Sequence, residues 1–410
     1  MRAGFAKVDI TPPMGVELTG YGYYLERRCT HVVDPLYIHA LALENEKGEK
    51  FLLISCDVLG MSSAAVAAVH EHAEKTYGIA PENTMLVSVH THTGPSFKYH
   101  TGCGEVDDDY VATVPPRMMQ VVDAALADLK SVSGISFAME QLARPHAYNR
   151  TTPDGLVDQM VRAFFITREN ARPIAMLSYA CHAVCRGHSD GVSADYPGAC
   201  CAMMEEKGYE CMFLNGLCGD IDPLECAEEA RDGAIRAFAQ DVVARAFSAP
   251  EQLPLTVEGG WVKDELRLAP ITREAIHAAV HKAETADNMI PGADKVARVW
   301  ADEMLAKFDT LREVEELHVA YLVLGGVPIV ALPFEGFTQT GILIRQQMEE
   351  PRALTLGCAE ELKGYLPTRD DIERGAYAAI ESTFLYKRLP CLPGEAERLG
   401  ESVGRKLKAR

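Results

Sequence analysis

Residues 85–95 of the chain read MLVSVHTHTGP. The apolar run 85–89 is short and rich in aliphatic side chains, so it predicts a buried strand. His90 and His92 follow at once, and Gly94 with Pro95 then predicts a turn. If the strand continues through the histidines, both side chains share one face, because side-chain direction alternates with a period of two. The segment therefore predicts two imidazoles side by side at a strand end.

Other apolar runs also end in residues that can bind metals or move protons. They are 174–180 before His182, 211–214 before Asp220 and Asp222, and 327–334 before Glu335. Ligands of open α/β sheets bind beyond the carboxyl ends of the strands. These strand ends are therefore predicted to converge on one site.

Strand and helix patterns alternate along most of the chain. The sequence predicts strands at 51–58, 85–89, 174–180 and 211–214, helices at 62–76, 117–129 and 227–247, and a hairpin of 319–324 with 328–332. This alternation is typical of the α/β class.

Residues 272–313 differ from this pattern. They are rich in Ala, Lys and Glu and predict two helices, separated at Ile290, Pro291 and Gly292. We interpret them as a helical insertion within a single domain that spans residues 1–410. The charged segment 393–410 predicts a final helix.

Composition excludes several classes of function. The 410 residues carry a net charge of −19, and a protein that binds phosphate backbones needs a basic face, so no nucleic-acid partner is expected. The longest apolar stretch, 321–334, is shorter than the ~20 residues of a membrane-spanning helix. The first ten residues lack the apolar core of a signal peptide. We therefore expect a cytoplasmic protein without a membrane span, whose twelve cysteines are mostly buried, reduced thiols. A homo-oligomer is left open.

The histidines and Glu335 favour a metal site. Two histidines and one carboxylate form a known catalytic zinc set that leaves a position open for water. A rival structural zinc site would use Cys181, His182, Cys185 and His188. It is less favoured, because neighbouring residues on a strand point to opposite faces.

Several motifs together resemble the catalytic domain of the neutral/alkaline, non-lysosomal ceramidase family, which are zinc amidohydrolases. They occur in the family's order: GFAKVDITPPMGVELTGYG at 4–22, HTHTGP at 90–95, Asn149 with Arg150, His182 with SADYPG at 193–198, GDIDP at 219–223, LPFEGFTQTG at 332–341 and GYLPT at 364–368. The resemblance implies a layered mixed β-sheet core flanked by helices.

The resemblance also implies roles for individual residues. One zinc ion per chain would be held by His90, His182 and Glu335, although imidazole–carboxylate sites accept other divalent metals too. The catalytic residues would be His92, which would relay a proton, Arg150, which would polarise the scissile carbonyl, Tyr365, which would donate to the oxyanion, and Asp222. Asp57 is either a structural residue or one that orients a ligand histidine.

Two positions depart from the family's pattern. Asp222 stands where the family has a serine, and it could act as a base, bind an amino group or join the metal ligands. Leu362 stands where the resemblance implies a fourth, tyrosine ligand. We therefore predict a hydrolase that cleaves a linear amide in a small polar molecule with metal-activated water, rather than a true ceramidase. The alternatives are a metal-dependent ester, lactone or phosphoester hydrolase of the same fold and an inactive, ligand-binding descendant.

Overall fold

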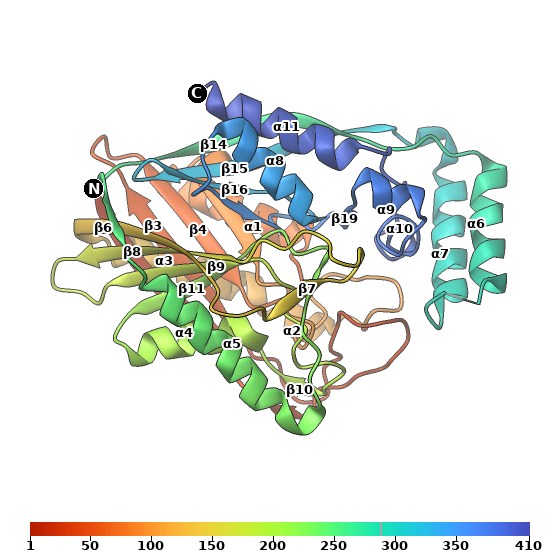
Figure 1. Cartoon of the computed structure of the whole chain (residues 1–410), viewed down its shortest axis with the longest axis horizontal. Helices are drawn as coiled ribbons and strands as arrows, with labels where there is room; N and C mark the ends of the chain where they lie inside the picture. The colour runs from red at the N-terminus through yellow and green to blue at the C-terminus, as the bar shows by residue number, and fades with distance from the viewer. Residues whose placement is uncertain (288) are drawn as a thin grey trace.

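A computed structural model of the chain describes residues 1–287 and 289–410. Its largest sheet has nine strands, in the order β11-β9-β8-β6-β1-β3-β4-β5 with β13 beside β6 (Figure 1). The strands are β1 (Arg2–Asp9), β3 (Tyr37–Glu44), β4 (Lys50–Cys56), β5 (Thr84–Ser88), β6 (Lys130–Gln141), β8 (Met160–Arg168), β9 (Ile174–Tyr179), β11 (Glu210–Asn215) and β13 (Glu251–Leu253). Only β4–β5 and β9–β11 pair in parallel within this sheet, as far as it is described, so the predicted mixed sheet is confirmed.

A second sheet packs on the first. It has the order β14-β15-β16-β18 and consists of β14 (Val257–Arg267), β15 (Val314–Leu324), β16 (Val327–Ala331) and β18 (Leu354–Leu356). The predicted hairpin is present as β15 and β16, and its turn residues Gly325 and Gly326 both have positive φ, as a tight two-residue turn requires. Leu53 and Phe164 of the first sheet share one buried core with Ile329 of the second, which confirms the layered arrangement.

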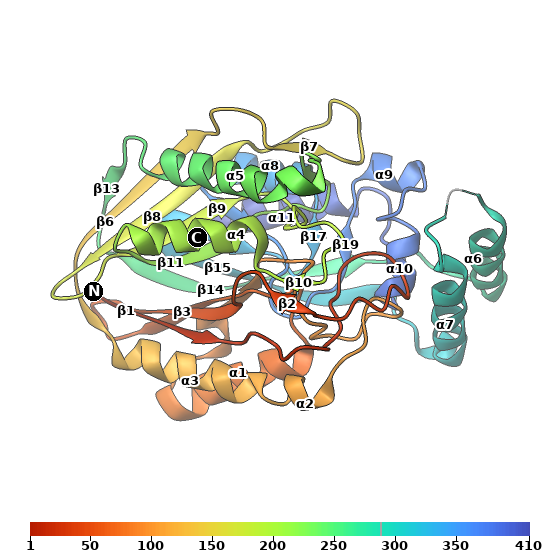
Figure 2. The same ribbon diagram turned by 90° about the horizontal axis from the view of Figure 1, so that it is seen from below.

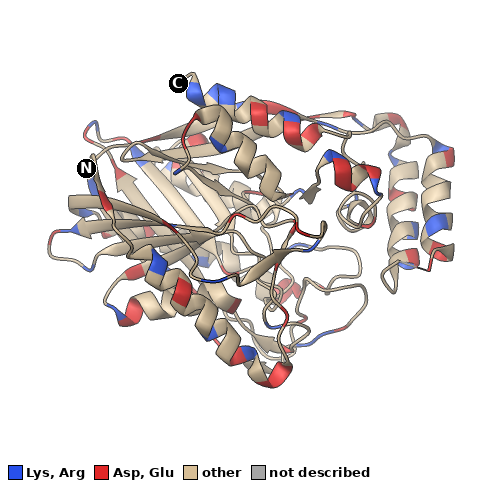
Figure 3. Ribbon diagram, in the orientation of Figure 1, with Lys and Arg blue, Asp and Glu red and all other residues tan. Residues whose placement is uncertain are grey.

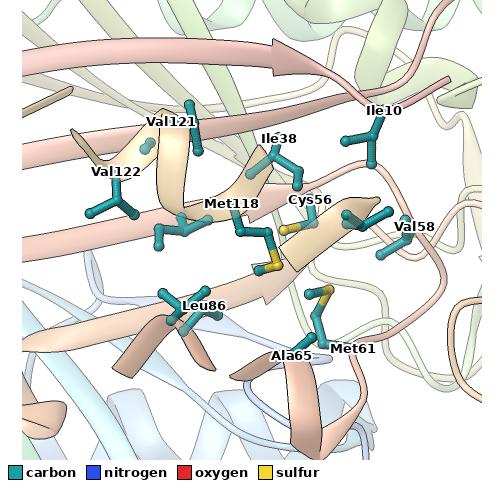
Figure 4. Close-up of a cluster of buried hydrophobic side chains, with 14 of the residues drawn as sticks. Ile10, Ile38, Cys56, Val58, Met61, Ala65, Leu86, Met118, Val121 and Val122 are labelled. Carbon is teal, nitrogen blue, oxygen red and sulfur yellow. The ribbon is translucent and has the colours of Figure 1, made fainter. Parts of the chain in front are cut away.

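Helices cover the outer faces of both sheets. In Figure 2, α1 (Ser63–Tyr77) and α3 (Val114–Ala127) lie on one side of β1 and β3, and α4 (Asp195–Glu206) and α5 (Arg231–Ala246) lie on the other side of the molecule. The end signals of α1 act as the sequence predicts, because Ser62 caps its first turn and Gly78 ends it in the left-handed conformation. Figure 4 shows Met118 and Val121 of α3 among the aliphatic side chains of the sheet, with Ile38 and Leu86 nearby.

The C-terminal half contributes helices to the second sheet and one end of the molecule. α8 (Thr338–Met348) and α11 (Glu395–Lys408) pack together over this sheet, and α6 (Arg273–Thr285) and α7 (Ala293–Ala306) form a hairpin at one end (Figure 1). Trp300 of α7 packs against Phe384, with ring centroids 5.0 Å apart. Charged residues lie mostly on the outer helices and on loops, while the strands carry few (Figure 3).

The remaining elements are short. They are β2 (His31–Val32), β7 (Ala147–Asn149), β10 (Gly191–Val192), β12 (Ile221–Pro223), β17 (Glu335–Gly336), β19 (Tyr365–Leu366), α2 (Asp108–Val111), α9 (Arg369–Glu373), α10 (Glu381–Leu385) and the 3-10 turns at Pro81–Asn83, Glu228–Ala230 and Phe308–Thr310. All twelve cysteines are free thiols. None of the helices in the described parts of the chain combines the length and apolar character needed to cross a membrane.

The two edge strands of the large sheet approach each other at their carboxyl ends. The Asn215 side chain at the end of β11 donates to the carbonyl of Val89, just after β5, at 2.8 Å. Ser55 of β4 likewise donates to the carbonyl of Phe213 at 2.6 Å. The sheet therefore curves so that the loops after β5, β9 and β11 meet.

Candidate metal centre

The segment after β5 turns instead of continuing as a strand. β5 stops two residues before His90, and His90 has a left-handed backbone conformation with φ of 65°. The expectation that a continued strand aligns the two imidazoles is therefore wrong. The turn instead pairs Thr91 with Ala183 in the loop after β9, and the N–H of His92 donates to the Ala183 carbonyl at 3.2 Å. This pairing brings both histidines beside His182.

The three imidazoles are buried together. His90, His92 and His182 are 1%, 7% and 0% exposed, and their ligand atoms lie within 4.8 Å of one another. The ring centroids of His90 and His182 are 5.0 Å apart. His182 thus gathers with His90 and His92, rather than with the cysteines of the rival zinc site.

Glu335 approaches the histidines from the other side. It lies in β17, which pairs with β19 so that Glu335 is opposite Tyr365, and its carboxylate is 2% exposed. Its Oε2 lies 3.1 Å from Nε2 of His90 and 3.2 Å from Nε2 of His182. One carboxylate oxygen therefore faces two imidazole nitrogens.

The backbone determines which imidazole nitrogen carries the hydrogen. Nδ1 of His90 lies 2.7 Å from the Leu59 carbonyl, and Nδ1 of His182 lies 3.1 Å from the Ile221 carbonyl. A carbonyl oxygen only accepts hydrogen bonds, so both Nδ1 atoms donate, and Nε2 of each neutral ring keeps its lone pair. Burial, and after it the nearby Arg150, lowers the pKa of His182, which favours the neutral ring.

Two nitrogen lone pairs and one carboxylate oxygen consequently converge on one point. Acceptors that face one another need a cation between them, and imidazole nitrogen with carboxylate oxygen is a donor set that suits zinc. In agreement, Nε2 of His90 is buried and makes no hydrogen bond with the described residues. The residues present therefore fit a divalent metal held by His90, His182 and Glu335.

His92 is the other candidate for the third ligand. Both of its ring nitrogens are buried and lack a hydrogen-bond partner among the described residues. Glu335 fits the ligand position better, because its Oε2 is close to both His90 and His182. His92 then remains available for a second task beside the metal.

Arg150 and Asp222 form the more solvent-accessible edge of the centre. Their side chains are 25% and 22% exposed, and Nη1 of Arg150 lies 3.3 Å from Oδ1 of Asp222. Nη2 of Arg150 also donates to the Tyr365 hydroxyl and to the Gly219 carbonyl, both at 2.9 Å. The structure thus brings together the seven residues to which the sequence assigned a metal-binding or catalytic role: His90, His92, Arg150, His182, Asp222, Glu335 and Tyr365.

Asp222 stands on the outer side of His182. Its Oδ1 is 3.6 Å from Nδ1 of His182, the ring nitrogen that does not face Glu335. Among the roles left open for this carboxylate, its position favours pairing with Arg150 over joining the metal ligands.

The loop after β1 covers the opposite side of His92. Gly20 has a φ of 114°, and a Cβ at this position would lie 2.5 Å from the His92 ring, so only glycine fits. The Tyr21 ring packs edge-on against His92, with centroids 5.0 Å apart, and Arg27 donates to the His92 carbonyl at 2.8 Å. A substrate would therefore approach from the side of Arg150.

Asp57 does not contact a ligand histidine. Its Oδ2 accepts a hydrogen bond from the backbone N–H of Tyr37 at 2.9 Å, and burial raises its pKa to about 8. The carbonyls of Leu59 and Ile221 orient the histidines instead.

Asp220 accepts from the N–H and hydroxyl of Thr338 and so caps the start of α8.

Sequence reasoning missed Tyr386 and His100. The Tyr386 hydroxyl donates to Oε1 of Glu335 at 2.5 Å, and the His100 ring, 2% exposed, packs 4.8 Å from the Tyr386 ring. Leu362 is fully buried and packs against Gly60. The phenol that holds Glu335 thus comes from a residue 51 positions further along the chain, outside every motif that the sequence analysis singled out.

Comparison with known proteins supports the fold. No protein-family model matches the chain, and no curated protein matches its sequence. A solved structure of neutral ceramidase from Pseudomonas aeruginosa matches with a TM-score of 0.77 and 17% identity, over 100% of this chain and 74% of that one. The chain has the neutral ceramidase fold. A ceramidase complexed with C2 also matches, with a TM-score of 0.74 and 15% identity, over 100% of this chain and 75% of that one.

At these identities the match confirms the neutral ceramidase fold that the motifs implied. The buried histidine cluster, which could bind a metal, is an observation on this chain alone.

Proposed function

We propose that the protein is a zinc-dependent amidohydrolase that cleaves a linear amide bond in a small polar substrate. The observation that supports this proposal best is the convergence of His90 Nε2, His182 Nε2 and Glu335 Oε2, with both imidazoles held in one tautomer by backbone carbonyls. The neutral ceramidase fold agrees with it, because the matched solved proteins are named ceramidases, a word for enzymes that cleave the amide bond of ceramide.

A zinc ion held by these residues would lower the pKa of a water molecule and polarise a carbonyl. The chain itself supplies the groups that handle the substrate. Arg150 lies at the accessible edge with the buried Tyr365 beside it. The Tyr365 hydroxyl accepts from Arg150, so its own hydrogen can point to Glu335 or to a substrate oxygen. Two such donors at one place suit the oxygen of a scissile carbonyl, where negative charge develops.

His92 is placed to move the proton. Burial, followed by the neighbouring His90 and His182, lowers its pKa well below the usual value, so the ring is neutral. A neutral imidazole nitrogen can accept the proton that water loses and return it to the leaving amine. Its unpartnered ring nitrogens leave it free to do so.

Asp222 favours a polar substrate. A carboxylate beside Arg150 at the accessible edge can bind an amino group, and it makes this edge unsuitable for a purely apolar chain. We therefore propose a small molecule with a basic or hydrogen-bonding group near its amide, and we place the enzyme in the cytoplasm.

Metal analysis tests the proposal first. Protein purified without a metal-affinity tag is expected to contain about one zinc per chain. Glu335→Gln and His182→Ala are expected to lose it, while His92→Gln keeps the metal and loses turnover. His70→Gln is the matched control, because His70 also faces a carboxylate, that of Glu360, at 3.1 Å but has no second imidazole there.

A substrate panel then defines the reaction. Amides that carry an amino or carboxyl group are expected to be cleaved faster than matched esters and phosphoesters. Faster cleavage of phosphoesters or lactones than of amides would contradict the amidohydrolase proposal and support the alternative hydrolase. If the wild type and Glu335→Gln contain the same amount of metal and neither hydrolyses any class of substrate, the result would support an inactive, ligand-binding protein.

A further inference from the structure

A second group of buried charges lies between β8 and α8, away from the histidines. Oδ2 of Asp158 is 2.9 Å from Nη1 of Arg162 and 2.8 Å from Nη2 of Arg345. The three side chains are only 8–12% exposed. One carboxylate oxygen is therefore shared by two guanidinium groups.

The charges of this group do not balance. Both guanidinium groups are cations at neutral pH, although burial lowers the pKa of Arg345 to about 10. Glu349 is also nearby, but it is 73% exposed and pairs with Lys408 at 2.6 Å, so it does not neutralise the excess. Two guanidinium cations thus share one carboxylate, which leaves one positive charge without a counter-ion. A buried charge without a counter-ion is unfavourable.

Arg162 also has donors to spare, whereas Nη1 of Arg345 donates to the Thr355 hydroxyl at 2.8 Å. Nε of Arg162 is buried without a hydrogen-bond partner in the described residues. Nη2 of Arg162 has only a long contact of 3.4 Å with the Pro351 carbonyl. On the other side of the same two arginines, the buried hydroxyl of Tyr179 is also unpartnered among the described residues.

A cavity of about 390 Å³ opens beside these two side chains. Most of its remaining walls are apolar, formed by Met139, Met160, Ile342 and Pro351, and the side chains of Gln346 and the exposed Glu349 complete the lining. The volume falls within the range of small-ligand pockets, at roughly 300–1,000 Å³. Guanidinium groups at one side and apolar walls around them suit a ligand with an anionic head and an apolar tail.

We propose that this cavity binds a monoanionic amphiphile, a carboxylate on a short alkyl chain, with its head on Arg162 and Arg345. A carboxylate matches the guanidinium fork and contributes the one negative charge that the group lacks. A phosphate dianion would overshoot that balance and would leave the apolar walls unused. None of the lining residues belongs to the histidine site, so the proposal is independent of the proposed reaction.

Calorimetric titration with sodium octanoate tests the site. One octanoate per chain is expected to bind, while octan-1-ol, with a similar tail but no charge, and sodium acetate, with the charge but no tail, bind at least about tenfold more weakly. Arg162→Gln is expected to weaken octanoate binding about tenfold or more. The control Arg405→Gln removes an arginine on α11 that is 56% exposed and should leave binding unchanged.

A second variant keeps the test decisive if Arg162→Gln fails to fold. Ile342→Trp fills the cavity from α8 and leaves every charge in place, so it should abolish binding while circular dichroism and the thermal midpoint stay close to the wild type. Equal binding of octan-1-ol, undiminished octanoate binding in either variant, or tighter binding of inorganic phosphate than of octanoate would each overturn the proposal. So would the absence of any octanoate binding.

Discussion

Glu335 and Asp264 are both buried carboxylates, each 2% exposed, yet their surroundings differ. Asp264 lies in β14 beneath α11, where it accepts from Arg398 at 3.0 Å, Lys406 at 2.7 Å and Ser402 at 2.6 Å. Burial alone would raise its pKa, but these hydrogen bonds lower the pKa to about 2. The chain supplies all the positive charge that Asp264 needs.

Glu335 has no such partners. In the part of the chain that the structure describes, no lysine or arginine lies within ion-pair distance of it, and its neighbours are two imidazoles and the Tyr386 hydroxyl. Cationic hydrogen-bond donors thus let a buried carboxylate stabilise the fold, whereas a buried carboxylate whose oxygen faces two imidazole lone pairs indicates a bound cation.

Removal of the proposed metal should have the largest effect. A metal whose Kd lies about a thousandfold below its free concentration stabilises the native state by about 4 kcal/mol. A chelator should therefore lower the free energy of unfolding by about that amount. Asp264→Asn should remain sensitive to the chelator, and Glu335→Gln should not. A chelator response that is the same in Glu335→Gln as in the wild type would contradict the ligand assignment.

Asp57 is a third buried carboxylate, and among the described residues only the backbone N–H of Tyr37 donates to it, so it is expected to keep its proton. Its folded pKa of about 8 lies above the ordinary 3.8, so the native state binds more protons than the unfolded state between these values, and stability falls as pH rises. The free energy of unfolding of the wild type, measured with urea, should fall by about 3 kcal/mol between about pH 5 and pH 8 relative to that of Asp57→Asn. Parallel pH profiles of the two proteins would show that Asp57 is ionised when folded.

Asp264→Asn should lower the free energy of unfolding by about 2 kcal/mol at neutral pH, because charge-assisted hydrogen bonds are lost. The folded pKa of Asp264 is about 2 and the ordinary value is 3.8, so its contribution is present above about pH 4 and is lost as pH falls towards 2. The difference in the free energy of unfolding between Asp264→Asn and the wild type should therefore become smaller as pH falls towards 2. Glu401→Gln on the exposed face of α11 is the control, with an expected change near zero.

Tyr386→Phe should have the smallest effect. It removes only the hydrogen bond to Oε1 of Glu335, and loss of a partner behind a metal ligand weakens metal binding by about tenfold. Competition with a chelating dye measures this change. The control Tyr99→Phe changes a tyrosine that is 47% exposed and should bind metal as the wild type does. An equal loss of affinity in both variants would contradict the role of Tyr386 in positioning Glu335.

Local sequence patterns were sufficient for much of the fold. Apolar runs and capping residues predicted β4, β5, β9 and β11 and the helix that Ser62 and Gly78 delimit, because these signals act within a few residues. The strand ends also identified the histidines and Glu335 as one group. The single-domain organisation over 1–410, the insertion at 272–313 and the cytoplasmic location stay predictions.

Contacts between distant segments were beyond the reach of these patterns. The left-handed turn at His90, the pairing of Thr91 with Ala183 and the hydrogen bond from Tyr386 to Glu335 depend on loops that meet only after the sheet curves. The same holds for Arg162 and Arg345, which are 183 positions apart and share one carboxylate. The order of residues was enough to predict the helices, the strands and the chemical types at their ends, since short-range forces act along the chain. Which charges are balanced became visible only in the folded molecule, because that balance depends on burial and on neighbours that the chain order does not reveal.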